Sequence, residues 1–421
     1  MEVINISKRR WYTLFVILLP LLNQYTILSM NFMDVFNIFV LLSYLLATKG
    51  RIKTGNGYIP YILYSLVLMC ISMLGLSVYS PVLMLKNVVS FTIFAFNLFF
   101  VGPDFFDLDY GFKCYTNIIL ISCVVAVFQT LLNIVFSKRL ILVIPWLTLN
   151  YGNGMSGSTF ISTVTSYYSY RASAFFLEPA YFAEFCLPFL FLALFNSDVR
   201  LSTKNIARCL FVTISVCLTT SMLGIVGCVI AWSIYLAQML WTSKRRKLII
   251  LIPIVIGAGL YIYNLESVQA QIVSKMYSAQ NLTMGTSLSL RLTRGWYCFD
   301  QLSSTHKMLG VGYGCVSPFF TQHNITTIID KEGIVNSYMN GISLMLCSLG
   351  IIGTLLYLLP LIKMFFQNKK VFMLLICWGI LMFTSQVFDT ASYFVLMIFI
   401  IVISRERRED GMIVDYSVNK F

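Results

Sequence analysis

Long uninterrupted runs of apolar residues alternate with short polar segments along nearly the whole chain. A helix that crosses the apolar core of a bilayer, about 30 Å thick, needs roughly 20 such residues. The runs are continuous rather than alternating, which favours helices over the strands of a membrane barrel. They predict about twelve spans, at residues 11–29, 31–48, 58–79, 82–101, 115–136, 174–196, 207–221, 222–242, 248–263, 337–360, 371–387 and 389–404. The stretch 207–242 is predicted as either a tight hairpin or one long helix.

Composition supports an all-α, polytopic integral membrane protein. The chain is 58% hydrophobic and 11% charged, whereas soluble globular proteins carry about 25% charged residues. No segment has the polar surface that a soluble domain needs, so residues 1–421 are expected to form a single transmembrane domain.

Basic residues predict the orientation of the chain in the membrane. Most of the 30 lysines and arginines lie in one alternating set of connections, including 8–10, 49–53, 244–247 and 405–408. Because cytoplasmic connections are enriched in Lys and Arg, both termini are predicted to be cytoplasmic. The net charge of +13 is then mainly an orientation signal and an attraction to membrane lipid. Clusters this short, set between apolar spans, form no groove for nucleic acid.

Two long loops remain on the opposite side, at residues 137–173 and 264–336, while the other external connections are short. Loops of this length are commonly functional. The first apolar span lacks a small-residue cleavage site and is predicted to act as an uncleaved anchor. No internal repeat is recognisable, which counts against a transporter built from two similar halves.

Three charged residues at the end of the first loop and the start of the next span are candidates for a functional site. Arg171, Glu178 and Glu184 lie around Pro179, which suits the first turn of the next span. Glu178 at a helix start has a purely structural explanation, because a carboxylate there is stabilised by the helix dipole. Arg171, which lies among aromatic residues, also has a purely structural explanation, because its side chain can extend to lipid headgroups. Glu184, deeper in an apolar run, is predicted to face a bundle interior or cavity.

The second loop contains an expected amphipathic helix at residues 288–300. Its Arg291 and Arg294 are three apart and are predicted to leave the same face. Paired guanidinium groups suit phosphate and pyrophosphate, although such a helix can also lie on lipid headgroups with Trp296 buried.

The glycines of Gly310–Gly314 predict a tight turn with close backbone approach. His306 and His323 are the only histidines, and no metal site is expected. Cys298 and Cys315 lie in the same external loop, where pairing is an open alternative to free buried thiols.

The stretch from Arg171 to Ala183 resembles the R-x-x-x-x-F-x-E-P-x-x-x-A signature of Wzy-type O-antigen and capsular polysaccharide repeat-unit polymerases, which are related to O-antigen ligases. The resemblance extends to Arg291, Arg294 and Trp296. It continues into Asn336-Ser-Tyr338 and the pair Gly350 and Gly353, which is similar to an H-N-x-Y and G-x-x-G stretch.

This resemblance implies a multi-pass glycosyltransferase of the bacterial inner membrane. The enzyme would act on the periplasmic face, join oligosaccharide repeat units carried on undecaprenyl pyrophosphate, and need no cofactor. Arg171, Arg291 and Arg294 would hold the pyrophosphate, which is also the leaving group. Partners would be the lipid-linked oligosaccharide, membrane lipid and a chain-length regulator. The aromatic residues expected against sugar rings are Tyr167, Tyr168, Tyr170 and Trp296, with His323, Asn336 and Tyr338 as further substrate-binding candidates.

One position departs from the ligase-like pattern, which has histidine where this chain has Val335. Glu178 is therefore the leading candidate for the general base, followed by His323, Asp330 and Glu332. The same departure favours a polymerase over a ligase. A flippase or exporter of the same lipid-linked oligosaccharide is the other alternative, and a membrane scaffold would not need arginines from two loops.

Overall fold

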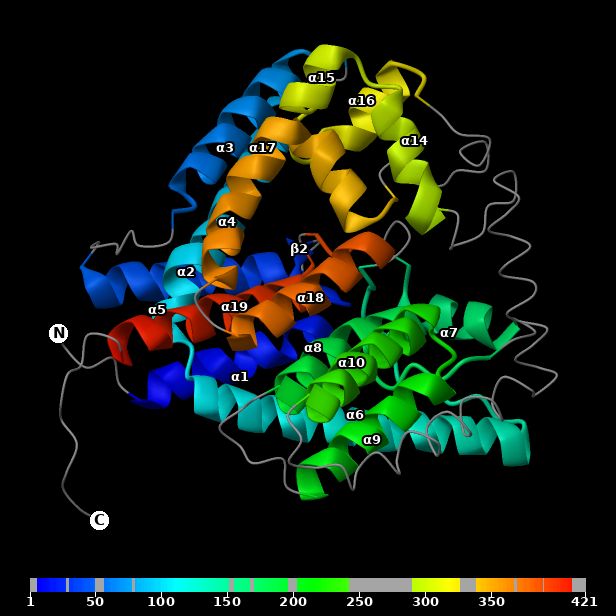
Figure 1. Ribbon diagram of the computed structural model, residues 1–421. Coiled ribbons are helices and arrows are strands. Elements are labelled where there is room, and N and C mark those ends of the chain that lie inside the picture. Colours follow the sequence, from blue (N-terminus) through cyan, green and yellow to red (C-terminus); the bar gives the residue numbers. More distant parts are fainter. Residues whose placement is uncertain are drawn as a thin grey trace.

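The protein is described here by a computed structural model that covers residues 6–27, 30–49, 57–77, 80–150, 155–166, 170–195, 203–241, 290–325, 338–366, 369–388 and 390–410. It is mostly helical (Figure 1). The N-terminal half contains α1 (Ile6–Leu22), β1 (Thr26–Ile27), β2 (Met30–Asn31), α2 (Phe32–Thr48), α3 (Ile59–Leu74), α4 (Pro81–Phe96), the π-helix η1 (Asn97–Val101), α5 (Gly102–Phe105), α6 (Leu108–Phe136), α7 (Gly157–Ser166) and α8 (Pro179–Phe195). The remainder contains α9 (Thr203–Leu218), α10 (Met222–Trp241), the π-helix η3 (Leu290–Arg294), α14 (Gly295–Asp300), α15 (Ser304–Leu309), α16 (Val316–Gln322), α17 (Gly341–Phe365), α18 (Lys369–Thr384) and α19 (Ala391–Asp410).

Each predicted span except 248–263 has a helix over most of its length, and 248–263 lies outside the described residues. Four helices in the described part are long and apolar enough to cross a membrane: Pro81–Phe105, Leu108–Phe136, Met222–Met239 and Gly341–Phe365. Five further apolar helices are shorter. The all-α membrane fold is thus supported, whereas a count of about twelve spans is not established. The stretch 207–242 forms two helices, α9 and α10, that separate at Thr219–Ser221.

Local sequence signals set several helix starts. The Ser80 side chain accepts a hydrogen bond from the Leu83 amide at 3.5 Å, with Pro81 in the first turn of α4. The Asp107 carboxylate accepts from the Tyr110 amide at 3.0 Å and begins α6. Such side chains satisfy amides that have no partner inside the helix.

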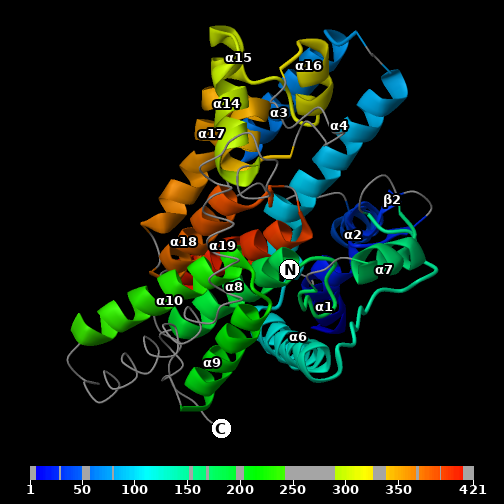
Figure 2. The ribbon, with the colours of Figure 1, turned by 90° about the vertical axis from the view of Figure 1, so that its right-hand side faces the viewer.

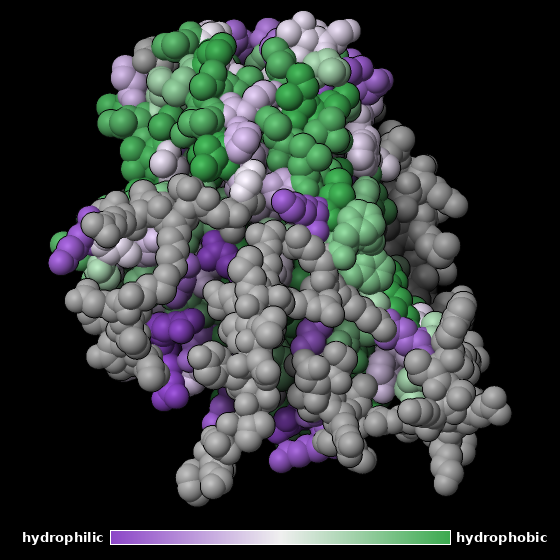
Figure 3. Space-filling model, turned by 60° about the vertical axis from the view of Figure 1, so that its left-hand side comes forward, coloured by the Kyte–Doolittle hydropathy of each residue, from purple (hydrophilic) through white to green (hydrophobic). Residues whose placement is uncertain are grey.

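Helix α8 occupies the centre of the molecule and is buried along most of its length (Figures 1 and 2). It packs against α6, α9, α10, α18 and α19. A helix that is apolar on all sides is expected in such a position. The outer helices, in contrast, expose large apolar side chains. Examples are Leu63, Val67 and Ile71 of α3 and Val82 and Leu85 of α4. Figure 3 shows this hydrophobic area across the upper part of the molecule, as a lipid-facing surface requires.

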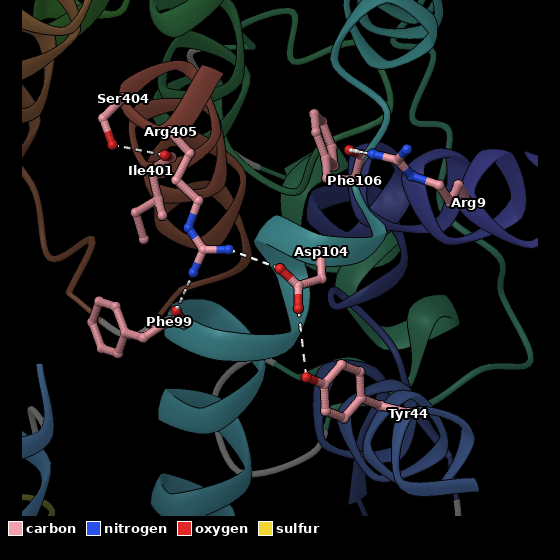
Figure 4. A network of polar contacts seen from close by, with 8 residues as sticks. All are labelled: Arg9, Tyr44, Phe99, Asp104, Phe106, Ile401, Ser404 and Arg405. Carbon is pink, nitrogen blue, oxygen red and sulfur yellow. Dashed lines mark hydrogen bonds and ion pairs between the residues drawn. The ribbon is translucent and has the colours of Figure 1, made fainter. Parts of the chain in front are cut away.

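One end of the bundle is joined by a polar network (Figure 4). Arg405 of α19 donates to a carboxylate oxygen of Asp104 in α5 at 2.9 Å, and Tyr44 of α2 reaches the other carboxylate oxygen at 3.5 Å. Arg9 of α1 donates to the carbonyl oxygen of Phe106 at 3.1 Å. These two arginines, which belong to the basic clusters predicted to set the orientation of the chain, therefore also join α1, α2, α5 and α19.

Close backbone approach occurs at the glycine-rich turn, as predicted. Helix α17 is interrupted at Gly350, whose φ is 65°. The turn lies against this break, where the amides of Val311 and Gly312 donate to the carbonyl oxygens of Cys347 and Ser348 at 2.9 and 2.8 Å. A Cβ atom at Gly310, whose φ is 88°, would lie 2.5 Å from the main-chain nitrogen of Gly350. The contact holds α15 onto α17.

We expect Gly310→Ala to destabilise the protein by roughly 3 kcal/mol, because the new methyl group meets backbone and the φ is unfavourable for alanine. The measurement is thermal unfolding of the purified protein in detergent. Gly379→Ala in α18 is the matched control, since nothing lies within 4 Å of a Cβ atom at that position. Equal melting temperatures for the two variants would contradict the packing described.

Candidate functional site

The end of the first long loop forms a compact turn that leads into α8. The Ser173 hydroxyl donates to the carbonyl oxygen of Phe176 at 2.7 Å, and the Phe176 amide donates to the carbonyl oxygen of Ser173 at 2.9 Å. Ala174 adopts a left-handed conformation with φ 54°. Burial of Phe176 and Leu177 fixes the segment to the bundle. Arg171 and Glu178 stand on either side of this turn.

Glu178 directly precedes the first residue of α8, as the sequence predicts. Its carbonyl oxygen accepts from the amides of Tyr181 and Phe182 at 3.1 and 3.3 Å. Its carboxylate lies at the helix N-terminus, where negative charge is favourable. Pro179 occupies the first turn, where its missing N–H costs no hydrogen bond. Glu178 thus has the predicted structural role at the start of α8, and its position also allows contact with the second loop.

Arg291 of η3 makes that contact. Its Nη2 lies 3.9 Å from Oε2 of Glu178, with the side chains 14% and 32% exposed. Its Nε donates to the Tyr338 hydroxyl at 3.0 Å, and the guanidinium carbon lies 5.9 Å from the Tyr338 ring centroid. Partial burial acts to lower the pKa of Arg291, but Tyr338, Glu184 and Glu178 outweigh it and raise the pKa overall. Arg291 is therefore a fixed cation between the two loops.

Arg171 belongs to the same electrostatic group. Although its side chain is exposed, nearby protein partly desolvates the guanidinium and lowers its pKa; Glu178 acts in the opposite direction, and Arg291 lowers it further. Two guanidinium groups thus lie near Glu178 at the N-terminal end of α8. Such a site is suited to a multivalent anion.

Arg294 is more deeply buried than Arg291. It is only 3% exposed, and its Nη1 donates to the main-chain carbonyl oxygen of Tyr338 at 2.9 Å. The two arginines do converge on Tyr338, but Arg294 holds its backbone while Arg291 holds its hydroxyl. The contact of Arg294 with pyrophosphate remains a prediction.

Asn340 and Ser385 tie the site to the helix bundle. The Asn340 side chain donates to the carbonyl oxygen of Arg291 at 2.7 Å and accepts from the Ser343 amide at 2.8 Å, which begins α17. The Ser385 carbonyl oxygen accepts from the Gly341 amide at 2.9 Å, and its hydroxyl donates to Glu184. A closed series of contacts thus runs from α8 through η3, α17 and α18 back to α8.

Glu184 is buried, with 2% of its surface exposed. This confirms the prediction that it faces the bundle interior rather than lipid. It is also close enough to affect the pKa of Arg291, so the candidate site extends inward from the rim.

Other predicted residues are dispersed. Trp296 lies on α14 and is 38% exposed. The Tyr170 hydroxyl donates to the carbonyl oxygen of Leu140 at 2.6 Å, and partial burial raises its pKa to about 12. His323 ends α16, is exposed, and has its ring 4.2 Å from that of Phe319. In the part of the chain that the structure describes, no hydrogen bond or ion pair joins His323 to the arginines. The predicted residues that lie outside the described residues are Tyr167, Tyr168, Asp330, Glu332, Val335 and Asn336.

Cys298 and Cys315 are buried thiols and do not form a disulfide. Cys298 packs with Leu302 and Cys347, and Cys315 belongs to the main apolar core. Among the described residues there is no group of three or more His, Cys, Asp or Glu side chains that could hold a metal ion.

Two residues of the site, Asn340 and Ser385, were not predicted from the sequence. Asn340, before Gly341 and a long apolar run, carries an ordinary helix-start signal that could have been noticed. Ser385 carries no such signal, because a serine at a helix end is common and its contact with Glu184 depends on the tertiary fold.

Comparison of the chain with family models, with curated proteins and with solved structures finds no match.

Proposed function

We propose that this protein is a polysaccharide polymerase of the bacterial inner membrane that joins oligosaccharide repeat units carried on undecaprenyl pyrophosphate. The observation that carries the proposal is the contact between the second long loop and the segment that follows the first, in which Arg291 meets Glu178 beside Arg171. In this proposal both termini are cytoplasmic and the site opens to the periplasm.

The arginines bind the diphosphate of the donor lipid. Guanidinium groups donate paired hydrogen bonds to phosphate oxygens and stabilise the charge that develops as the pyrophosphate departs. Arg291 is already oriented by Tyr338 and Asn340, so little conformational entropy is lost when it binds the anion. Arg171, more exposed, supplies the second cation from the other loop.

Glu178 is the general base in this reaction. The acceptor hydroxyl oxygen forms a bond to the anomeric carbon of the donor sugar as the bond from that carbon to the pyrophosphate oxygen breaks. The bonding electron pair leaves with the pyrophosphate, and the hydroxyl proton passes to Glu178. The ion pair with Arg291 is long, at 3.9 Å. A bound diphosphate would compete for Arg291 and so release the carboxylate to accept a proton.

The remaining assignments follow from the exposed apolar surface and from the family resemblance. The prenyl chain lies in lipid beside the outer helices. Trp296, half-exposed on α14, stacks on a sugar ring. A separate chain-length regulator would bind elsewhere on the protein.

A deletion strain tests this function through the surface polysaccharide of the cell. Loss of a polymerase should leave single capped repeat units on the lipid core, and the plasmid-borne gene should restore the ladder of longer chains. Long lipid-linked chains that accumulate without reaching the core would instead identify a ligase. Repeat units that stay on the cytoplasmic side would identify a flippase.

A further inference from the structure

We infer that two buried glutamines, Gln24 and Gln129, act as a clamp that sets the positions of Arg171 and Glu178. The inference deepens the proposed function and rests on it, because these two charged residues are its anion-binding and proton-accepting groups. Gln24 follows α1 and Gln129 lies in α6, so both come from parts of the chain far from the first-loop end that they contact.

Gln129 is 1% exposed and pairs with the main chain at residues 173 and 174. Its Oε1 accepts from the amides of Ser173 and Ala174 at 3.1 and 2.8 Å, and its Nε2 donates to the carbonyl oxygen of Ala174 at 2.9 Å. One side-chain amide thereby binds both the N–H and the C=O of Ala174, whose left-handed φ of 54° is unusual for a residue other than glycine.

Gln24 is 7% exposed and pairs with the main chain at residues 175 and 177. Its Oε1 accepts from the Leu177 amide at 2.7 Å, and its Nε2 donates to the carbonyl oxygen of Phe175 at 3.1 Å. A second bond from Nε2 reaches the carbonyl oxygen of Leu21 at 3.0 Å, which fastens the side chain to the end of α1.

These contacts supply hydrogen-bond partners for buried main-chain groups. The segment 173–177 is neither helix nor strand, yet much of it is buried against an apolar bundle. Main-chain groups without water must find partners inside the protein. A glutamine side chain presents one acceptor and one two-proton donor, which matches an irregular backbone that exposes both N–H and C=O groups. Ionised glutamate lacks the donor, and methionine lacks effective hydrogen bonding in either direction.

The clamp bears directly on the candidate site because of where the clamped segment ends. Arg171 precedes Ser173 by two residues, and Glu178 follows Leu177 by one. With the turn held at both ends to α1 and α6, the Glu178 carboxylate is presented to Arg291 from a fixed direction. Gln24 and Gln129 are therefore positioning residues, which touch no substrate themselves.

The test uses Gln129→Met and Gln24→Met in the purified full-length protein in lipid nanodiscs. Methionine has nearly the same length and volume and tolerates an apolar setting. Gln238→Met in α10 is the control, since Gln238 is a half-buried glutamine of an apolar helix whose side chain donates to Met373 and not to the segment 173–177. Two quantities are measured: amide hydrogen exchange of peptides covering 170–178, and the initial rate of chain growth with a lipid-linked repeat unit.

We expect Gln129→Met to speed exchange at Ser173 and Ala174 about tenfold or more, because their amides lose their acceptor. Gln24→Met should have this effect at Leu177. The rate of chain growth should fall about tenfold or more in both, while exchange in α17 and the behaviour of Gln238→Met stay at wild-type values.

Unchanged exchange over 170–178 in both glutamine variants would overturn the clamp. Faster exchange with an unchanged growth rate would overturn its positioning role. A wild-type protein that makes no polymer would instead refute the proposed function, and the exchange experiment would still decide whether the clamp exists.

Discussion

Arg291→Ala should abolish long polysaccharide chains while the protein remains in the membrane at its normal level. The guanidinium joins the second long loop to the start of α8 through Glu178 at 3.9 Å, and its Nε donates to the Tyr338 hydroxyl at 3.0 Å. Removing one preorganised donor to a developing negative charge typically lowers turnover by roughly 10² to 10³-fold. The measurement is the ladder of surface polysaccharide from a deletion strain that carries the variant gene.

Arg291→Lys separates geometry from charge. Lysine keeps the positive charge but loses the planar fork and the Nε–H that binds Tyr338, so it should restore only a small part of the long chains. Lys307→Ala is the control for charge alone, because Lys307 lies in the same loop but pairs with the exposed Asp300. Wild-type chain lengths in Arg291→Ala would exclude this residue from the reaction.

Glu178→Gln should lower the rate of chain growth by roughly 10² to 10⁴-fold, which is the usual contribution of a general base. The substitution keeps the size of the side chain and removes its charge and basicity. Because Arg291 then loses its carboxylate partner, binding of the lipid-linked substrate should be retained or become tighter. Loss of turnover with retained binding is the specific signature of a base, and it needs both measurements on the purified protein.

Asp300→Asn is the matched control for removing an acidic charge, since Asp300 is well exposed and lies at the end of α14. Growth near the wild-type rate in Glu178→Gln would leave Glu178 only its place at the start of α8. A parallel loss of substrate binding and turnover would assign it to binding rather than to proton transfer.

Hydrophobic patterning predicted most of this fold because membrane spans are encoded locally. Runs of about 20 apolar residues are recognisable without any tertiary information, and helices lie over the predicted segments that the structure describes. The start of α8 was also predictable, since Pro179 and the preceding Glu178 carry positional preferences of their own. The depth of Glu184 followed from its apolar neighbours.

Side-chain partners were less predictable because they depend on which helices meet. A spacing of three predicted that Arg291 and Arg294 leave the same face, and both contact Tyr338. Their different burial depends on the packing of η3 against the segment before α17, which buries Arg294 and leaves Arg291 partly exposed. The sequence shows Gln24 and Gln129 only as side-chain amides in or beside an apolar run, which does not predict what they bind. Their role appears only when residues 173–177 lie next to α1 and α6.

The most direct test of the account is chain growth by the purified protein on a defined repeat unit linked to undecaprenyl pyrophosphate, with wild type and Arg291→Ala compared side by side. Products are separated by size on a gel and identified by mass spectrometry. The account predicts a ladder of multiples of the repeat unit for wild type and only the single unit for Arg291→Ala. No ladder from wild type, or the same ladder from both proteins, would contradict it.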